Sequence, residues 1–442
     1  VNGTSSLSED IATQSKGMIP LLDMILKEIP DPIYDYDAPL QFQPALLDYN
    51  DYVGRIGIGR ITRGKMHLNE MVSCVRVDKS IKKFRIQKIY SFLGLKKIEV
   101  EEADAGDIVA IAGLDDIYVG ETICKEGLEE ALPLIKVSEP TVQMNFGTNT
   151  SPFAGKEGQF VTGRKIEERL FRETQRDVSL RINRVDNKEE WIVSGRGELH
   201  LSILIENLRR EGFEFQVSRP RVILKEIDGV INEPYEYVQV DVPDEYIGSA
   251  IEMFGNRRGN LEGMNSKDGQ TRLIYTIPSK GLIGFMTDFL TATHGYGIIN
   301  HTFLEYRPVQ PDVFMGRKLG VLVSINQGMA TTYACGGVED RGELLIEPGI
   351  MVYEGMIVGI CNREEDLAVN ITREKQMTNQ RSATKDSTTV LKKPRVFSLE
   401  NYLSFIDEDE LVEVTPNSIR LRKMILDTVE RKKYDSTKLK KH

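Results

Sequence analysis

The spacing of apolar residues changes several times along the chain, and each change marks a different kind of element. Near the start, Ile19, Leu22, Ile25 and Ile29 recur at helical intervals. Pro20 lies near the start of this stripe, and Pro30 and Pro32 end it, because proline lacks the backbone donor that a helix interior requires. The pattern predicts one amphipathic helix over residues 18–29, which we expect to dock on the following domain or on a neighbouring molecule.

Residues 39–126 alternate between apolar and polar positions, as half-buried strands do. Glycines punctuate these short runs at the tight turns and corners that a small closed sheet requires. We therefore predict a small antiparallel β-barrel. Its strands are expected at 40–49, 52–61, 71–77, 85–90, 107–112 and 121–124.

The next two segments, 140–226 and 232–308, each mix the strand and helix periods in the order βαββαβ. This order is typical of ferredoxin-like domains, and its repetition predicts two consecutive modules. Beyond residue 311 the apolar runs indicate a β-rich domain, interrupted by a flexible basic loop over 373–389 and ending in a frayed segment from Arg431. The predicted fold is thus multidomain, β and α+β, with boundaries at 1–30, 31–135, 136–226, 227–310 and 311–442.

Composition excludes several classes of protein. Hydrophobic residues make up 40% and charged residues 28% of the 442 positions, and no apolar run is long enough to span a bilayer. No secretory signal is visible, so we expect a soluble, cytoplasmic protein without membrane contact. The four cysteines and five histidines lack the spacing of a disulfide framework or a metal site, which predicts reduced thiols and no bound metal.

The net charge of −10 hides a basic C-terminal region. Residues 373–395 hold seven Lys or Arg against two acids, and residues 420–442 hold nine against three. In the first stretch the cations alternate with amide and hydroxyl groups, a mixture that binds phosphate backbones. Although an isolated basic cluster is usually a solvated face, here we predict RNA contacts. The candidate residues are Arg373, Lys375, Asn379, Arg381, Lys385, Lys392, Lys393, Arg395, Arg420, Arg422 and Lys423.

Two glycine-containing segments partly match known catalytic motifs. Residues 59–66 match the phosphate-binding pattern GxxxxGK, but Met66 replaces the hydroxyl residue that would bind Mg²⁺, and no helix is predicted to follow. Residues 194–201 pass from a strand through glycines into a helix without forming GxSxG, so they indicate a structural corner or a contact surface. We predict no catalytic residue, and no nucleotide hydrolysis by this chain.

Particular blocks of residues resemble domains of translational GTPases. The segment Asp51–Ile61 resembles their second domain, and Gly195–Leu201 resembles the third domain of elongation factor G. Pro234–Glu236 and Gly281–Gly284 resemble its fifth domain, yet only residues 220–233 separate the two modules, where elongation factor G inserts another domain. This spacing excludes a translocase.

The C-terminal region is similar to the domain peculiar to the BipA/TypA family of bacterial translational GTPases. The similarity rests on three blocks, Asp366–Asn370, Thr378–Ala383 and Leu411–Pro416. It implies that the GTPase domain, which binds GTP and Mg in the intact parent, is missing here, and that the helix over 18–29 is its last helix. This chain is then expected to bind no cofactor and to be no enzyme.

The resemblance also implies partners and a role. They are the large and small subunits of the bacterial ribosome, ribosomal RNA and A-site transfer RNA, bound by a monomer that serves translation regulation, stress adaptation or large-subunit assembly. Two alternatives stay open at this point. One is a protein-interaction scaffold in ribosome assembly, suggested by the acidic net charge, and the other is a stand-alone nucleotide-binding enzyme, suggested by residues 59–66.

Overall fold

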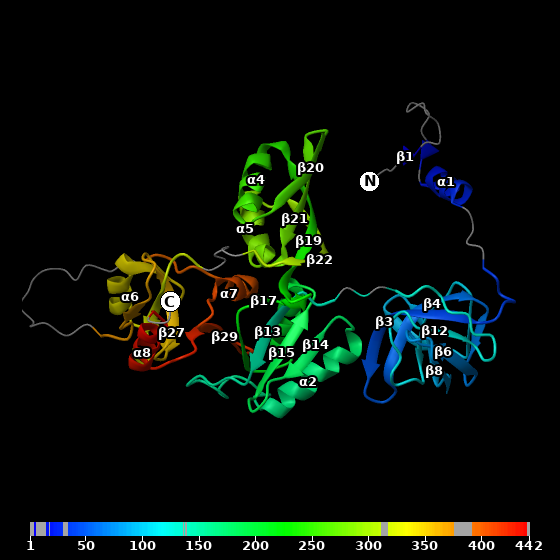
Figure 1. Ribbon diagram of the computed structural model, residues 1–442, viewed down its shortest axis with the longest axis horizontal. Coiled ribbons are helices and arrows are strands. Elements are labelled where there is room, and N and C mark those ends of the chain that lie inside the picture. Colours follow the sequence, from blue (N-terminus) through cyan, green and yellow to red (C-terminus); the bar gives the residue numbers. More distant parts are fainter. Residues whose placement is uncertain are drawn as a thin grey trace, which may run out of the picture. The chain divides into compact units, whose positions relative to one another are not determined.

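A computed structural model describes residues 4–5, 15–16, 18–29, 34–135, 137, 139–310, 317–374 and 391–439 (Figure 1). They divide into two compact units, 1–136 and 137–442, and each unit is a body of its own. The predicted barrel falls in the first unit, and the two predicted βαββαβ modules and the C-terminal region fall in the second.

The first unit begins with a short strand pair and one helix. The strands are β1 (Thr4–Ser5) and β2 (Ser15–Lys16), and helix α1 (Ile19–Glu28) forms where the apolar stripe predicts it, with proline in its first turn. No residue of α1 is buried, and Leu26 is 80% exposed. The expected docking on the following strands is therefore not seen among the described residues.

Eight antiparallel strands form the sheet of the first unit in the order β7-β6-β12-β3-β4-β11-β8-β9, and a separate pair joins β10 to β5. Their apolar faces enclose a core that includes Phe42, Ile61 and Val109, all fully buried. The strands are β3 (Gln41–Asn50), β4 (Gly54–Arg63), β5 (Lys65–His67), β6 (Met71–Val75), β7 (Ile81–Arg85), β8 (Lys88–Leu93), β9 (Lys96–Glu99), β10 (Glu102–Asp104), β11 (Ile108–Ala112) and β12 (Thr122–Lys125).

The segment that imitates a phosphate-binding loop lies in β4 and β5, and strands replace the helix that such a loop needs. A Cβ atom at Gly59 would lie 2.0 Å from the Gln43 carbonyl oxygen, and Gly64 has a φ of +75° at the turn. These glycines therefore allow close strand pairing and a tight turn, as the sequence predicts.

The first module of the second unit has the predicted βαββαβ order. Its strands pair antiparallel in the order β14-β15-β13-β16. The elements are β13 (Val142–Gly147), α2 (Gly163–Arg176), β14 (Arg181–Arg184), β15 (Glu190–Gly195), α3 (Glu198–Arg210) and β16 (Phe215–Val217), and β17 (Arg221–Val222) pairs with β13. Gly195 ends β15 and Glu198 begins α3, so the glycine block is the predicted strand-to-helix corner.

The C-terminal region continues this sheet instead of forming a separate one. Strand β29 pairs with β16, and the sheet then runs through β30, β27, β23 and β28. Further elements are the pair of β24 with β26, and β25 on β27. The strands are β23 (Val321–Ser324), β24 (Gly328–Met329), β25 (Gly342–Leu344), β26 (Met351–Val352), β27 (Met356–Cys361), β28 (Leu367–Val369), β29 (Glu410–Val414) and β30 (Ile419–Lys423). The segments predicted as separate domains at 136–226 and 311–442 thus share one sheet.

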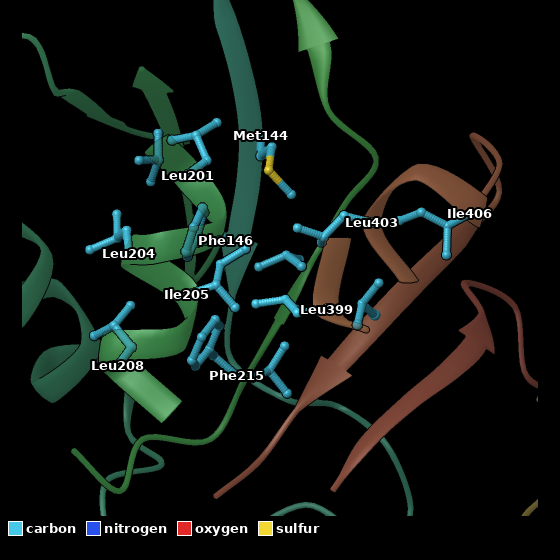
Figure 2. Close-up of a cluster of buried hydrophobic side chains, with 14 of the residues drawn as sticks. Met144, Phe146, Leu201, Leu204, Ile205, Leu208, Phe215, Leu399, Leu403 and Ile406 are labelled. Atoms are coloured by element: carbon cyan, nitrogen blue, oxygen red, sulfur yellow. The ribbon is translucent and has the colours of Figure 1, made fainter. Parts of the chain in front are cut away.

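The two segments also share one hydrophobic core (Figure 2). Helix α7 (Leu399–Phe405) places Leu399 and Leu403 beside Ile205 of α3 and Phe215 of β16, and all four side chains are buried. Burial of a large aliphatic or aromatic side chain contributes roughly 1.5–3 kcal/mol. The first module therefore depends on residues almost 200 positions later in the chain for part of its core.

The described residues of the C-terminal region form three α-helices that the prediction of a β-rich domain missed. They are α6 (Thr332–Val338), α7 and α8 (Thr428–Leu439). Ser398 and Asn401 form a capping box at α7, a signal visible in the sequence. Asp427 accepts the backbone N–H groups of Val429 and Glu430 at the start of α8. The prediction that the chain frays from Arg431 is therefore wrong for the described part of this helix.

The second module repeats the same strand order but stands on its own core. Its sheet order is β20-β21-β19-β22, and β18 pairs with the first residues of β19. Helices α4 and α5 lie on one face of this sheet (Figure 1). Phe254, Phe285 and Phe289 pack together against Val240 and Tyr275. The elements are β18 (Lys225–Ile227), β19 (Val230–Pro243), the 3-10 helix η1 (Asp244–Tyr246), α4 (Ile247–Asn256), β20 (Asn260–Lys267), β21 (Gln270–Pro278), the 3-10 helix η2 (Ser279–Leu282), α5 (Phe285–Ala292) and β22 (Ile298–Pro308). A third 3-10 helix, η3 (Glu339–Arg341), belongs to the C-terminal region.

Candidate nucleic-acid interface

Four of the predicted RNA-contacting residues lie at the two ends of one segment. Arg373 follows β28, and Lys392, Lys393 and Arg395 precede α7; all four are exposed. The predicted residues Lys375, Asn379, Arg381 and Lys385 lie outside the described residues, as does most of the predicted flexible loop. The described residues on both sides of the segment 375–390 thus include exposed cations.

Backbone hydrogen bonds anchor both ends of this segment to the C-terminal region. The Thr331 hydroxyl donates to the Arg373 carbonyl oxygen at 2.6 Å, and the Lys392 N–H donates to the Glu339 carboxylate at 2.7 Å. The Arg395 N–H donates to the Leu344 carbonyl oxygen at 2.9 Å. Because the backbone is held at three points, the cationic side chains extend from fixed positions.

Acidic groups accompany these cations. The Arg395 guanidinium lies 3.5 Å from the Glu343 carboxylate and 5.4 Å from the centroid of the Phe397 ring. Both members of this ion pair are more than half exposed, so water screens their attraction, and such pairs contribute ~0–1 kcal/mol. A phosphate oxygen could therefore replace Glu343 as the partner of Arg395 at little cost.

The three remaining candidates, Arg420, Arg422 and Lys423, lie on β30, where their side chains are almost entirely enclosed. Arg422 and Lys423 are each 2% exposed, and the Arg420 side chain is 12% exposed. Carboxylates surround Lys423, and Arg422 donates to the Thr150 hydroxyl and the Gln216 amide oxygen, so neither side chain leaves a surface for a phosphate. The prediction of direct RNA contact is wrong for Arg422 and Lys423, and Arg420 is already bound to Glu413 and Glu157.

Lys423 is the centre of a buried charge cluster. Its ammonium group lies 2.5 Å from Asp366, 2.8 Å from Asp409 and 2.8 Å from Glu410. Burial disfavours the charged form, but these three carboxylates outweigh it and raise the pKa of Lys423. Glu410 also accepts two hydrogen bonds from Arg317, at 2.7 and 2.8 Å, and although burial opposes it, Arg317 and Lys423 lower the pKa of Glu410. This cluster joins β30 to β29 and to the residue that precedes β28.

A second set of buried carboxylates holds the loop between β13 and α2. Glu214 accepts the N–H groups of Gly155 at 2.8 Å and of Gly158 at 2.9 Å, and it is fully buried. Glu413 accepts hydrogen bonds from Ser151 at 3.0 Å and from the Tyr353 hydroxyl at 2.7 Å. Arg420 and Lys423 of β30 are thus structural counterions, whereas Arg422 donates to uncharged side chains. The signal for this was present in the sequence, since Glu413 and Arg420 stand opposite each other across a short hairpin.

Other kinds of site find no support in the described part of the chain. Within those ranges no three His, Cys, Asp or Glu side chains come together to hold a metal ion. All four cysteines are buried and free. None of the helices seen there combines the length and the hydropathy that a membrane span needs.

Sequence comparisons match four known domain families along the chain. Residues 54–124 match elongation factor Tu domain 2, and residues 161–219 match elongation factor G, domain III. Residues 230–316 match the elongation factor G C-terminus. Residues 319–428 match the TypA/BipA C-terminal domain, the region that holds the candidate interface.

Three similar proteins carry the name large ribosomal subunit assembly factor BipA. That of Bacillus subtilis is 56% identical over 98% of this chain and 71% of its own length. That of Synechocystis is 49% identical over 94% of this chain and 70% of its own, and that of Escherichia coli K12 is 48% identical over 98% and 71%. The identities and coverage agree with the domain matches. The chain belongs to the BipA/TypA family of translational GTPases.

Proposed function

We propose that this chain is the ribosome- and RNA-binding portion of a BipA/TypA-type translational GTPase, and that it acts in assembly of the large subunit. The relatives are named as assembly factors of that subunit, which supports the choice of partner. The observation that carries the proposal is that the described residues flanking the segment 375–390 include four exposed cations, Arg373, Lys392, Lys393 and Arg395. In this proposal a β-barrel and two ferredoxin-like domains carry the C-terminal region, which binds ribosomal RNA and the transfer RNA in the A site.

Phosphate contacts would supply most of the affinity, so binding should weaken steeply with salt. Each cation that contacts a phosphate releases about one counterion and contributes about one unit to the slope of log K against log salt. The residues that flank the segment 375–390 are suited to this role because their backbone is anchored and the ion pair of Arg395 with Glu343 is exposed.

The test is co-sedimentation with ribosomal large subunits over a series of salt concentrations. The double variant Lys392→Ala/Lys393→Ala should bind about tenfold more weakly, with a salt slope reduced by about two. Lys79→Ala/Lys96→Ala removes two exposed lysines from the first unit and is the matched control. Equal loss in both variants, or no loss in either, would contradict the proposed interface.

A protein-interaction scaffold is the second candidate. It is favoured by the acidic groups Glu339 and Glu343 beside the cations, and by the net charge of −10. Nuclease treatment of captured complexes separates the two functions. Partners that are released when RNA is digested support RNA binding, and partners that are retained support the scaffold.

We infer further that GTP and Mg²⁺ bind to a domain of the parent protein and not to this chain. The residues of the near-motif do not fit a nucleotide, because Met66 is fully buried and the glycines serve strand pairing. Calorimetric titration with GTP and Mg²⁺ should therefore give no heat of binding. Micromolar affinity would restore the stand-alone nucleotide-binding enzyme as an explanation.

A further inference from the structure

A cavity of about 190 Å³ lies where the two βαββαβ modules and helix α7 meet, and we call it the junction cavity. The first module contributes the start of α3, the second contributes η2, the start of α5 and parts of β19 and β22, and α7 contributes Glu400. The space exceeds what one water molecule needs by about tenfold. It is large enough for a small organic molecule.

Two polar groups that line the junction cavity are left without partners. Glu198 accepts the Gly284 N–H at 2.7 Å through Oε2, but its buried Oε1 has no hydrogen-bond partner among the described residues. Ser279 is 2% exposed, and its hydroxyl also lacks a partner there. An unsatisfied buried polar group costs about 1–3 kcal/mol. Their presence at one cavity indicates that a hydrogen-bonding ligand completes the site.

The charges around the cavity select a cation. Three carboxylates line it, from Glu198, Glu236 and Glu400. His301 is hydrogen-bonded to Glu236. The nearby Arg257 is already engaged, because it donates to the carbonyl oxygen of Ile283 at 3.0 Å and pairs with Asp288 at 3.5 Å. Glu198 is therefore left without an ion-pair partner among the described residues.

The surroundings of Glu198 disfavour the charged form of its carboxyl group. Burial, with a smaller contribution from the negative charge of Glu400, raises the pKa of Glu198 to about 7, while the Gly284 N–H and Arg257 favour the charged form. A cation bound beside the carboxylate would stabilise its charged form. Affinity for a cation should accordingly increase as the pH rises through 7.

The walls of the cavity are mainly apolar. Leu199, Leu282, Phe285 and Ile299 line it, and Leu199 is 66% exposed near the start of α3. An aromatic face also attracts ammonium groups. These walls select a ligand with an apolar body as well as a positive charge.

We propose that the junction cavity binds a small organic ammonium ion, whose N–H groups donate to Glu198 Oε1 and Ser279 Oγ and whose apolar body lies against Leu199, Leu282 and Phe285. Such a ligand contacts both modules at once. It therefore stabilises their contact at Glu198 and Gly284. This site is independent of the proposed RNA interface, because no residue of that interface lines the cavity.

The experiment is an NMR titration of the full chain with ¹³C-labelled methionine methyl groups, because Met286 lines the cavity and reports on it directly. The probe is phenethylammonium, and the matched compounds are the neutral phenethyl alcohol and the anionic phenylacetate. We expect a saturable shift of the Met286 signal with the ammonium ion at millimolar concentration, and at least tenfold weaker binding of the other two.

Two variants test which side chains contribute to binding of the ammonium ion. Glu198→Gln removes the charge at nearly constant shape and should weaken phenethylammonium binding at least tenfold, and Ser279→Ala should weaken it severalfold. Glu252→Gln, on the exposed side of α4, is the control and should change nothing. The other methionine signals show whether each variant is folded.

Three results would overturn the proposal. They are the absence of a saturable Met286 shift, equal binding of the alcohol and the ammonium ion, and unchanged binding by both folded cavity variants. Equal binding of the alcohol would identify the space as a purely apolar cavity. None of these results bears on ribosome binding, which the co-sedimentation experiment tests separately.

Discussion

The two βαββαβ modules share an order of elements and an order of strands, yet different neighbours stabilise them. In the first module, edge strand β16 pairs with β29, and α7 completes the core. In the second, β22 pairs with β19 alone among the described strands, and aromatic side chains of α4 and α5 close the core from within. Topology alone therefore does not decide whether a module is autonomous. The contacts at its edge and its open face decide it.

The largest expected difference between the modules comes from truncating one aromatic core residue in each. Phe215→Ala should cost about 3–5 kcal/mol and should expose both the first module and β29, because they share one core. Phe254→Ala should cost a similar amount but affect only the second module. Hydrogen exchange measured by mass spectrometry reports on each segment separately. The comparison fails if Phe215→Ala leaves the exchange of residues 410–423 unchanged.

Removal of one buried charge is the next largest perturbation. Glu410→Gln leaves Arg317 and Lys423 without their shared partner, and we expect a loss of about 3 kcal/mol in the free energy of unfolding of the shared sheet. Glu343→Gln breaks the exposed pair with Arg395 and should cost less than ~1 kcal/mol. Both values can be obtained from denaturant melts followed by hydrogen exchange. Similar losses in the two variants would show that the buried cluster is not a structural centre.

A substitution at Gly284 tests the contact between the modules separately from the stability of each module. Its φ is +67°, and a Cβ atom there would lie 2.6 Å from the Cβ of Ser404 in α7. Gly269 has a φ of +80° with no atom within 4 Å, so Gly269→Ala measures the backbone cost alone. We expect Gly284→Ala to cost about 2 kcal/mol more than Gly269→Ala. Faster exchange confined to α5 and α7 would support this, and equal costs would contradict it.

The smallest expected effect is a pH dependence at Glu198. Its folded pKa of about 7 lies above the ordinary value of 4.5, chiefly because the carboxyl is buried. The folded state therefore holds the proton more tightly, and stability should fall as the pH rises from about 4.5 through 7. Glu198 as a whole residue is half-buried, so solvent screening limits the change to about 1–2 kcal/mol. Exchange of the Gly284 amide between pH 5 and 8 measures it, and Glu198→Gln should remove the dependence.

Local patterns in the sequence were sufficient for many elements. The apolar stripe predicts α1 to within one residue at each end, and the alternating periods predict the helices and strands of both modules. These predictions succeed because side-chain periodicity directly reflects which face of an element is buried. The capping box at Ser398 was an equally local signal for α7.

Contacts between distant segments were beyond such reasoning. Nothing in residues 215–217 indicates that they pair with residues 412–414, since many strands offer the same alternation. Arg422 and Lys423 count as basic residues in the sequence, and only the fold places carboxylates around Lys423 and encloses Arg422. The junction cavity likewise joins residues from three parts of the chain. Charge content predicted a basic region, but the fold assigns its described members either to the surface or to the core.

The pairing of β16 with β29 also has a consequence for biosynthesis. Because β29 begins at Glu410, a growing chain completes the first module only after about 200 further residues have been made, which takes roughly 10–40 s at typical bacterial rates. The second module, encoded between the two partners, can close its own core in that interval. Until β29 and α7 emerge, the nascent first module presents a bare strand edge and an open apolar face, the kind of surface at which unfinished chains aggregate.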